Sequence, residues 1–205
     1  MNSLDQFKKN LNILINNYNI LKKYRITPIN LNLGGGFPES TIMPQDRLRK
    51  IAKLIKRMLL NSEIKYENIY IEPGRYFVGD SGFFITKIVT IKEDRWIFLN
   101  IGNHICPKFA RCSLRFYNAT LIDEPHKYKT SIAGILPTDQ DVLGKNYFFT
   151  EKLKKGDKVL VLNTGAYCLT FSNRFPYILP RILLIKDSSI REIFNPETDI
   201  DFSIN

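Results

Sequence analysis

The chain has 205 residues, of which 44% are hydrophobic and 24% charged, and its formal net charge is +10. This length and balance favour a globular protein with one large domain or two small ones, each able to bury a core. No apolar run is long enough to span a bilayer, and the first residues lack the basic and apolar regions of a signal peptide. We therefore expect a protein without a membrane segment or a leader.

The cysteine content and the charge indicate the cellular compartment and the classes of partner. The three cysteines, Cys106, Cys112 and Cys168, make no disulfide framework, which favours a reducing, cytoplasmic compartment. The positive charge raises nucleic-acid binding as an option. However, Lys and Arg are spread over the whole chain, and neither zinc-finger spacing nor an aromatic RNA-binding signature is present. We expect no nucleic-acid partner.

The first part of the chain alternates helical and extended patterns. Apolar residues recur at helical spacing from Leu4 to Tyr24, and Ile29–Leu33 is a short apolar strand that ends in three glycines. Pro44 opens a second amphipathic helix that runs to about Leu60, and Asn68–Glu72 is a second short strand. This order predicts a parallel α/β unit.

The pattern changes near Asp80, after which short strands dominate. Phe83–Ile91 and Arg95–Ile101 flank a predicted hairpin turn. Further strands are predicted at Ser131–Leu136, Lys158–Asn163, Arg181–Lys186 and Ile190–Phe194. We therefore predict an α/β domain over residues 1–80, a β-rich domain over 81–194 that is sandwich-like or barrel-like, and a loose acidic tail over 195–205.

The glycine triplet Gly34, Gly35 and Gly36 is the first candidate binding motif. Glycines after a strand remove every Cβ, so backbone N–H groups can approach a phosphate closely. Phe37-Pro38 fixes how the chain leaves the loop. A lone glycine triplet is equally well a tight, flexible loop, so the motif gains weight only from its neighbours.

The segment Glu72-Pro73-Gly74-Arg75 follows the second strand. Chemistry in parallel barrels gathers at the C-terminal ends of strands. A carboxylate there can hold a pyridine nitrogen protonated, and an arginine can grip a phosphate with its planar fork. The alternative is a surface Glu72–Arg75 pair beside a turn, but the nearby glycine loop favours a site.

Two downstream segments add weaker candidates. Tyr167 follows Gly165-Ala166 after a strand, where its phenol could donate to a phosphate, although a strand-end aromatic is commonly structural. Asp139 and Asp141 could face an amine substrate, although a polar loop between strands is the simpler interpretation. His104 and Cys106 form an isolated pair and His126 lies in a turn, so we predict no metal site.

Together these motifs resemble the fold-type III pyridoxal-phosphate (PLP) decarboxylases, which include ornithine, diaminopimelate and arginine decarboxylases. The resemblance runs from about Ile29 to Lys186. It implies the C-terminal part of an alanine-racemase-like (β/α)8 barrel, its last two strands, followed by a β domain. It also implies PLP as the cofactor and a small amino acid as the substrate. The cofactor-binding residues that it implies are Gly34, Gly35, Gly36, Glu72, Gly74, Arg75 and Tyr167.

The chain departs from that family in two ways. Family members are roughly twice as long, and the lysine that binds PLP covalently lies in their early barrel, so no residue here corresponds to it. The family also carries a cysteine in a Gly-Pro-x-Cys-x-x-x-Asp segment, where this chain has Pro137 and keeps the aspartate as Asp141. We therefore assign no catalytic residue, and Asp141 only weakly favours an amine substrate.

Three hypotheses follow for the function. The first is a C-terminal fragment of a decarboxylase, of carboxy-lyase lineage and inactive as an isolated chain, that works with a separate N-terminal half. The second is a non-catalytic interaction protein that forms a homodimer, or a heterodimer with a decarboxylase, since family enzymes share sites between subunits. The third is a decayed remnant. We expect the first lineage, because the cofactor motifs are retained.

Overall fold

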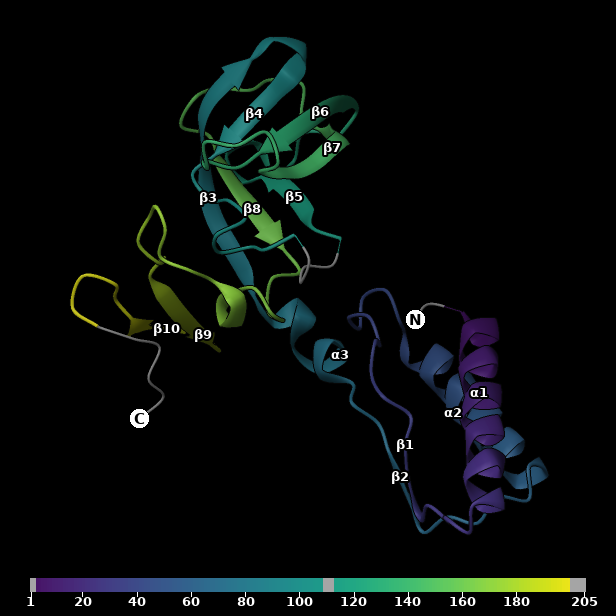
Figure 1. Cartoon of the computed structure of the whole chain (residues 1–205). Helices are drawn as coiled ribbons and strands as arrows, with labels where there is room; N and C mark the ends of the chain where they lie inside the picture. The colour runs from purple at the N-terminus through teal and green to yellow at the C-terminus, as the bar shows by residue number, and fades with distance from the viewer. Residues whose placement is uncertain (1–2, 109–112, 200–205) are drawn as a thin grey trace. The chain divides into compact units, whose positions relative to one another are not determined.

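The chain folds into two compact units, seen in a computed structural model (Figure 1). The first unit is Met1–Phe83 with Leu162–Ala166, and the second is Phe84–Val161 with Tyr167–Asn205. Within these ranges the structure describes residues 3–108 and 113–199. The return of residues 162–166 to the first unit was not predicted, because it depends on contacts between segments far apart in sequence.

The first unit contains two long helices beside a two-stranded parallel sheet. Helix α1 (Leu4–Lys23) is capped by Ser3, whose side chain accepts from the backbone N–H of Gln6 at 3.2 Å, and basic residues end its last turn. Helix α2 (Gln45–Asn61) packs along α1 (Figure 1). Strands β1 (Asn30–Asn32) and β2 (Asn68–Tyr70) pair in parallel, as the sequence predicts.

The core of the first unit covers only one face of this sheet. Leu31 in β1 is buried among side chains of α1 and α2, while Asn30 and Asn32 on either side of it are exposed. Side chains alternate between faces along a strand, so the two asparagines lie on the face that the helices leave open. After β2 come the short helix α3 (Gly74–Val78) and the 3-10 turn η1 (Gly79–Ser81).

The second unit is built on a six-stranded mixed sheet in the order β5-β8-β3-β4-β6-β7. Its strands are β3 (Phe83–Lys92), β4 (Trp96–Leu99), β5 (Arg115–Asn118), β6 (Tyr128–Ala133), β7 (Val142–Phe149) and β8 (Lys158–Leu162). The pairs β3–β4 and β6–β7 are antiparallel, while β4–β6 is parallel. The 3-10 turns η2 (Glu93–Arg95), η3 (Ala119–Leu121) and η4 (Leu169–Phe171) lie between strands.

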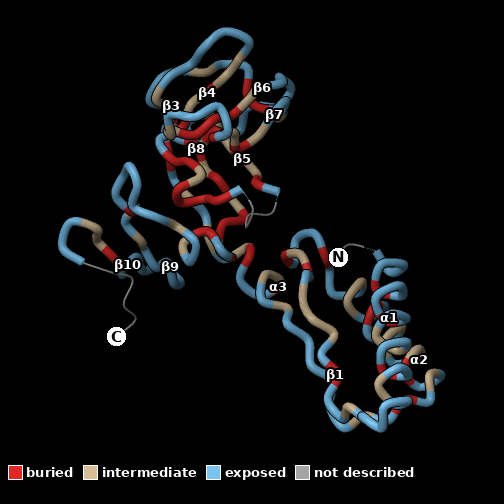
Figure 2. The backbone as a smooth tube through the Cα atoms, in the orientation of Figure 1, coloured by how far each residue is buried: buried red, intermediate tan, exposed pale blue. Residues whose placement is uncertain are grey.

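The sheet curls until its two outer strands touch, so it is nearly closed. The Phe116 backbone N–H in β5 donates to the Tyr147 hydroxyl in β7 at 3.1 Å, and the two rings meet edge to face at 5.2 Å. Figure 2 shows buried residues gathered inside this sheet. Closing the sheet in this way leaves few unpaired backbone groups at its edges.

Strands β9 (Ile182–Lys186) and β10 (Ser189–Phe194) form a separate antiparallel hairpin. Phe194 is buried in the core of the second unit, but most of the hairpin is exposed (Figure 2). Beyond it, the Asn195 N–H donates to the Asp199 carboxylate at 2.7 Å, which forms a turn in the predicted tail. The remainder of that tail, 200–205, lies outside the described residues.

Two strands were missed by the sequence pattern, and one was misplaced. Strand β7 contains Gly144 and Asn146, which indicate a turn, but Asn146 adopts φ +52° where the ladder with β6 is irregular. Strand β5 has only four residues. Strand β6 begins and ends three residues before the predicted strand, because the chain turns away at Gly134, whose N–H donates to the Asp141 carbonyl at 2.7 Å.

None of the helices within residues 3–108 and 113–199 combines the length and apolar character needed to cross a bilayer.

Candidate functional site

The glycine loop and the Glu72 segment lie together because their strands are parallel neighbours. Parallel strands end at the same edge of a sheet, so the residues after β1 meet those after β2. The Leu33 N–H donates to the Tyr70 carbonyl, and the Glu72 N–H donates to the Gly34 carbonyl, both at 2.9 Å. The two predicted motifs are therefore joined by backbone hydrogen bonds.

The three glycines of the loop have different structural requirements. Gly34 and Gly36 have φ of +70° and +80°, a region that L side chains rarely adopt. Gly35 has an ordinary φ, but a Cβ at that position would collide with the carbonyl oxygen of Glu72. The loop is thus a fixed turn pressed against the second motif, which argues against a merely flexible connection.

The Glu72 side chain is exposed and held at one oxygen. The Asn32 Nδ2 donates to Glu72 Oε1 at 2.6 Å, while Asn32 Oδ1 accepts from the Gly34 N–H at 2.8 Å. Within the described residues, Glu72 Oε2 makes no hydrogen bond, so it is available to a donor from outside. In this conformation the Gly34 N–H is engaged by Asn32 and does not face a ligand.

Gly74 and Arg75 begin helix α3 directly after Glu72-Pro73. Arg75 is half-buried, and its Cγ lies 3.2 Å from the position that a Cβ on Gly79 would occupy. The aliphatic part of Arg75 therefore lies along Gly79, which places the side chain in the same unit as the glycine loop.

A buried polar pair fastens the segment 162–166 to the first unit. The Glu39 carboxylate, which follows the glycine loop, is fully buried, and Asn163 Nδ2 donates to its Oε1 at 3.1 Å. The Gly165 N–H donates to the Gly79 carbonyl and the Thr164 N–H to the Gly82 carbonyl, both at 3.1 Å. This fastening fixes the residues that immediately precede Tyr167.

Tyr167 has a strained backbone. Its φ is +67°, which is rare for an aromatic residue, and its side chain is 44% exposed. Its ring lies 6.2 Å from that of Phe171 within the second unit. Strain of this kind persists where the surrounding structure enforces it and is common at functional positions.

Asp141 differs from the expectation of a residue that faces a substrate. Only 1% of it is exposed, Oδ1 accepts from the Asn103 N–H and Oδ2 from the Leu136 N–H, each at 2.8 Å. Cβ atoms on Gly102 or Gly134 would collide with this carboxylate. Its geometry is that of a brace between two loops, and a substrate contact stays a prediction.

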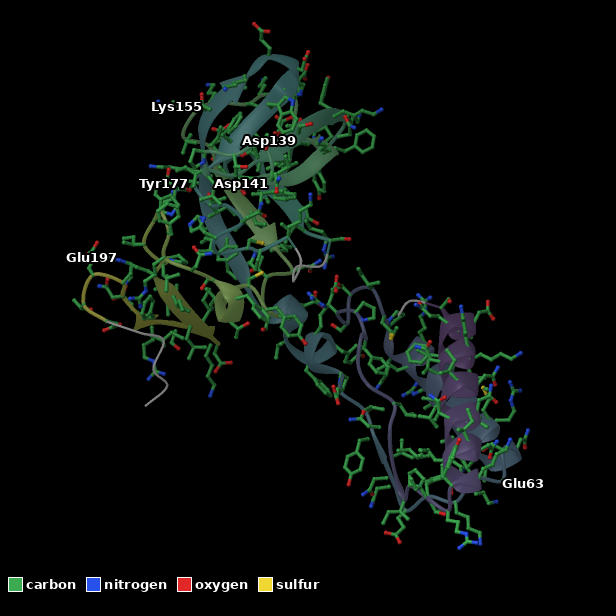
Figure 3. The ribbon with its side chains drawn as sticks, in the orientation of Figure 1. Glu63, Asp139, Asp141, Lys155, Tyr177 and Glu197 are labelled. Atoms are coloured by element: carbon green, nitrogen blue, oxygen red, sulfur yellow. The ribbon has the colours of Figure 1, made fainter. Side chains whose placement is uncertain are left out.

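The other residues of this segment are at the surface. Pro137 is exposed in a bend, and Asp139, labelled with Asp141 in Figure 3, is exposed as well. Among the residues of the described chain, no group of three His, Cys, Asp or Glu side chains is placed to hold a metal ion.

The interior of the second unit contains His104, Cys106 and Cys168. Burial lowers the pKa of His104 below its ordinary value of 6.5, and the charge of Asp141 opposes this shift. Cys106 and Cys168 are buried, with their sulfur atoms 3.7 Å apart. Cys112 lies outside the described residues.

Sequence reasoning missed Asn32, Glu39 and Asn163. Asn32 could have been found from strand alternation, because it shares the open face of β1 with Asn30 and lies two residues before the first loop glycine. Glu39 and Asn163 are 124 positions apart, and no local pattern connects them.

Comparison with known proteins identifies relatives along nearly the whole chain. Diaminopimelate decarboxylase of Staphylococcus aureus is 27% identical over 198 residues, a match that covers 90% of this chain and 47% of that enzyme. The crystal structure of diaminopimelate decarboxylase from Methanocaldococcus jannaschii has a TM-score of 0.74 at 23% identity, covering 95% of this chain and 46% of its own.

A third structure is the lysine decarboxylase of Selenomonas ruminantium, described in complex with PLP and cadaverine. It has a TM-score of 0.61 at 22% identity and covers 85% of this chain and 46% of its own. No family model matches the chain.

The chain spans about half the length of the curated relatives it matches. By sequence and by fold, it is a homologue of the diaminopimelate decarboxylases, within the fold-type III PLP decarboxylases, with the coverage of a C-terminal portion of those enzymes.

Proposed function

We propose that this chain is the PLP-binding C-terminal portion of an amino-acid decarboxylase, active when the rest of its barrel is present. The observation that carries the proposal is the junction of the glycine loop with Glu72, in which Gly35 leaves no room for a side chain. The PLP complex of the Selenomonas ruminantium relative supports the choice of cofactor.

The residues of the first unit fit PLP chemically. The backbone of Gly35 and Gly36 would cradle its phosphate with Gly74 and Arg75, and Glu72 Oε2 would accept from its pyridine nitrogen. When bound, PLP supplies an electron sink that stabilises the negative charge left where carbon dioxide departs. A hydrogen bond from the Tyr167 phenol to the phosphate stays a prediction of the resemblance.

The first unit also has surfaces suited to the remainder of a barrel. A groove of about 340 Å³ between α1 and β1 is lined largely by apolar side chains, among them Leu14, Leu21 and Leu33. Strand β1 is also an outer strand of its two-stranded sheet. A sheet this small is marginal in water, so further strands and helices would stabilise it. They would come from a longer version of this chain or from a separate one.

The substrate in this proposal is a small amino acid with a distal amine or carboxylate, as the names of the relatives suggest. A decarboxylase half or a second decarboxylase subunit would be the protein partner. We infer a cytoplasmic location from the cysteine use.

A second candidate is a non-catalytic protein that binds a decarboxylase. The observation that favours it is Pro137, which stands where the resembled family has a cysteine and which has neither a thiol nor an N–H. This candidate predicts assembly with a decarboxylase without turnover.

The test is to produce the full chain together with the lysine-bearing N-terminal half of a diaminopimelate decarboxylase. We expect co-purification, a rise in melting temperature with PLP, and release of carbon dioxide from diaminopimelate, lysine or ornithine. The Glu72→Gln variant, which keeps the size of the side chain, should assemble normally and lose turnover.

Two results would be decisive against parts of the proposal. Assembly with PLP binding but without carbon dioxide release would favour the non-catalytic candidate. Failure of the chain to assemble, together with a melt that PLP leaves unchanged, would refute a cofactor-binding role.

A further inference from the structure

We propose that Asn32 is a positioning residue that sets the direction of the Glu72 carboxylate and the shape of the phosphate loop together. The inference rests on the proposed function, since it assigns a role within the same PLP site. Its starting point is a single amide that contacts both motifs, at 2.6 Å to Glu72 Oε1 and 2.8 Å to the Gly34 nitrogen.

The two ends of one side-chain amide satisfy both contacts. The Gly34 N–H needs an acceptor and the Glu72 carboxylate needs a donor, and asparagine offers one of each from the same carbon. An aspartate would keep the acceptor for Gly34 but would face Glu72 with a second carboxylate. A leucine of similar size would supply neither group.

The position of Asn32 on the sheet explains why its amide can reach both partners. It is the last residue of β1, on the face opposite the buried Leu31, and its partner in β2 is Tyr70, two residues before Glu72. Residues two apart on a strand share a face, so Glu72 leaves the sheet on the side where Asn32 stands.

The contact has a chemical consequence for the site. With Oε1 held by Asn32, Glu72 presents Oε2 as its one oxygen without a hydrogen bond among the described residues. A ring nitrogen would therefore meet a carboxylate of fixed orientation. Fixing a catalytic contact in advance reduces the ordering that binding must supply.

The neighbouring amide pair provides a matched control. Asn68 Nδ2 donates to Asn30 Oδ1 at 2.9 Å on the same open face of the sheet. Replacing Asn30 by aspartate keeps that acceptor and makes the same change of charge, two residues earlier on the strand. An effect of general charge or strand stability would appear in both variants, whereas a positioning effect appears only at Asn32.

The test compares Asn32→Asp, Asn32→Leu and Asn30→Asp in the full chain, alone and assembled with the N-terminal half. Without cofactor, we expect hydrogen exchange of the Gly34 amide to stay slow in Asn32→Asp, which keeps the acceptor, and to accelerate in Asn32→Leu. With PLP, both Asn32 variants should bind at least about tenfold more weakly, as for loss of a hydrogen bond to a charged group.

A spectroscopic measurement separates positioning from a general loss of structure. With 15N-labelled PLP, the ring nitrogen resonance of the assembled protein should move in Asn32→Asp towards that of an unprotonated pyridine. It should stay in place in Asn30→Asp. If Asn32→Leu fails to fold, the Asp variant alone decides, because it preserves the contact with Gly34.

The outcomes for the two proposals are distinct. If the unmodified assembly binds no PLP, the proposed function fails, and the exchange of the Gly34 amide still shows whether Asn32 holds the loop. If the unmodified assembly binds PLP and both Asn32 variants match it in affinity and in ring-nitrogen resonance, the positioning role is overturned.

Discussion

The buried pair of Glu39 and Asn163 gives the sharpest prediction about how the site is held together. We expect Asn163→Gly to release the segment 162–166 from the first unit. Glycine keeps the positive φ of +69° at this position without strain, so the variant removes the amide and little else. Glu39→Gln is the companion variant, because it keeps an acceptor for Asn163 and removes the charge.

The burial of the pair determines how strongly Asn163→Gly should lower the free energy of local opening. Glu39 is 0% exposed and Asn163 is 1% exposed, so the lost hydrogen bond involves a charged group and cannot be replaced freely by water. Such a bond contributes about 1.5–3 kcal/mol. A loss of about 2 kcal/mol in local opening free energy corresponds to roughly 30-fold faster amide hydrogen exchange.

The assay is hydrogen exchange at Thr164 and Gly165, whose N–H groups donate to the Gly82 and Gly79 carbonyls. Ser40→Ala serves as the control, because it removes an exposed hydrogen bond to Asp80 and should change this exchange by less than about threefold. If Asn163→Gly leaves the two amides as protected as in the unmodified chain, the pair does not hold the segment and the reasoning is wrong.

Three further predictions concern the loop, pH and the core. Gly34→Ala should lower the free energy of unfolding by about 1–2 kcal/mol, because the φ of Gly34 is +70°, although a Cβ there would meet no other atom. Gly35→Ala should lower the melting temperature further, because its Cβ would collide with the backbone carbonyl of Glu72. Because burial lowers the pKa of His104, the contribution of this residue to stability is complete above pH 6.5 and is lost as the pH falls towards the pKa in the folded state. His104→Gln should therefore reduce the pH dependence of the free energy of unfolding measured in urea titrations. An unchanged pH dependence in this variant would exclude His104 as its source. Phe149→Ala, at a fully buried position, should reduce the free energy of unfolding by about 3–5 kcal/mol, and a loss under 1 kcal/mol would contradict the assigned core.

Local patterns predicted the parts of the molecule that local physics determines. The helices follow from apolar spacing, and the glycine loop and Glu72 follow from strand ends marked by Gly and Pro. Their junction was predictable because parallel strands must end together. Strand β7 was not predictable, since Gly144 and Asn146 have the composition of a turn and only pairing with β6 makes them a strand.

The role of a charged residue depended on burial, which the sequence does not display. Asp141 lies in a polar segment of the sequence, which is compatible with a substrate contact. In the fold, however, its carboxylate is buried and accepts hydrogen bonds from two backbone N–H groups. No motif marks Glu39 in the sequence, although its side chain is fully buried. Asn103 lies 38 positions from Asp141, and Asn163 lies 124 positions from Glu39, so contacts distant in sequence contribute to both outcomes.

The return of residues 162–166 to the first unit has a practical meaning for anyone who wishes to divide this protein. The two units are interleaved in the gene, so no single cut yields both intact. A truncation after Phe83 would strip the Glu39 carboxylate of its amide partner and leave the Gly79 and Gly82 carbonyls without their donors. If such a truncation folded poorly or aggregated, the loss of residues 162–166 would explain the result. The result would carry no information about the cofactor site itself.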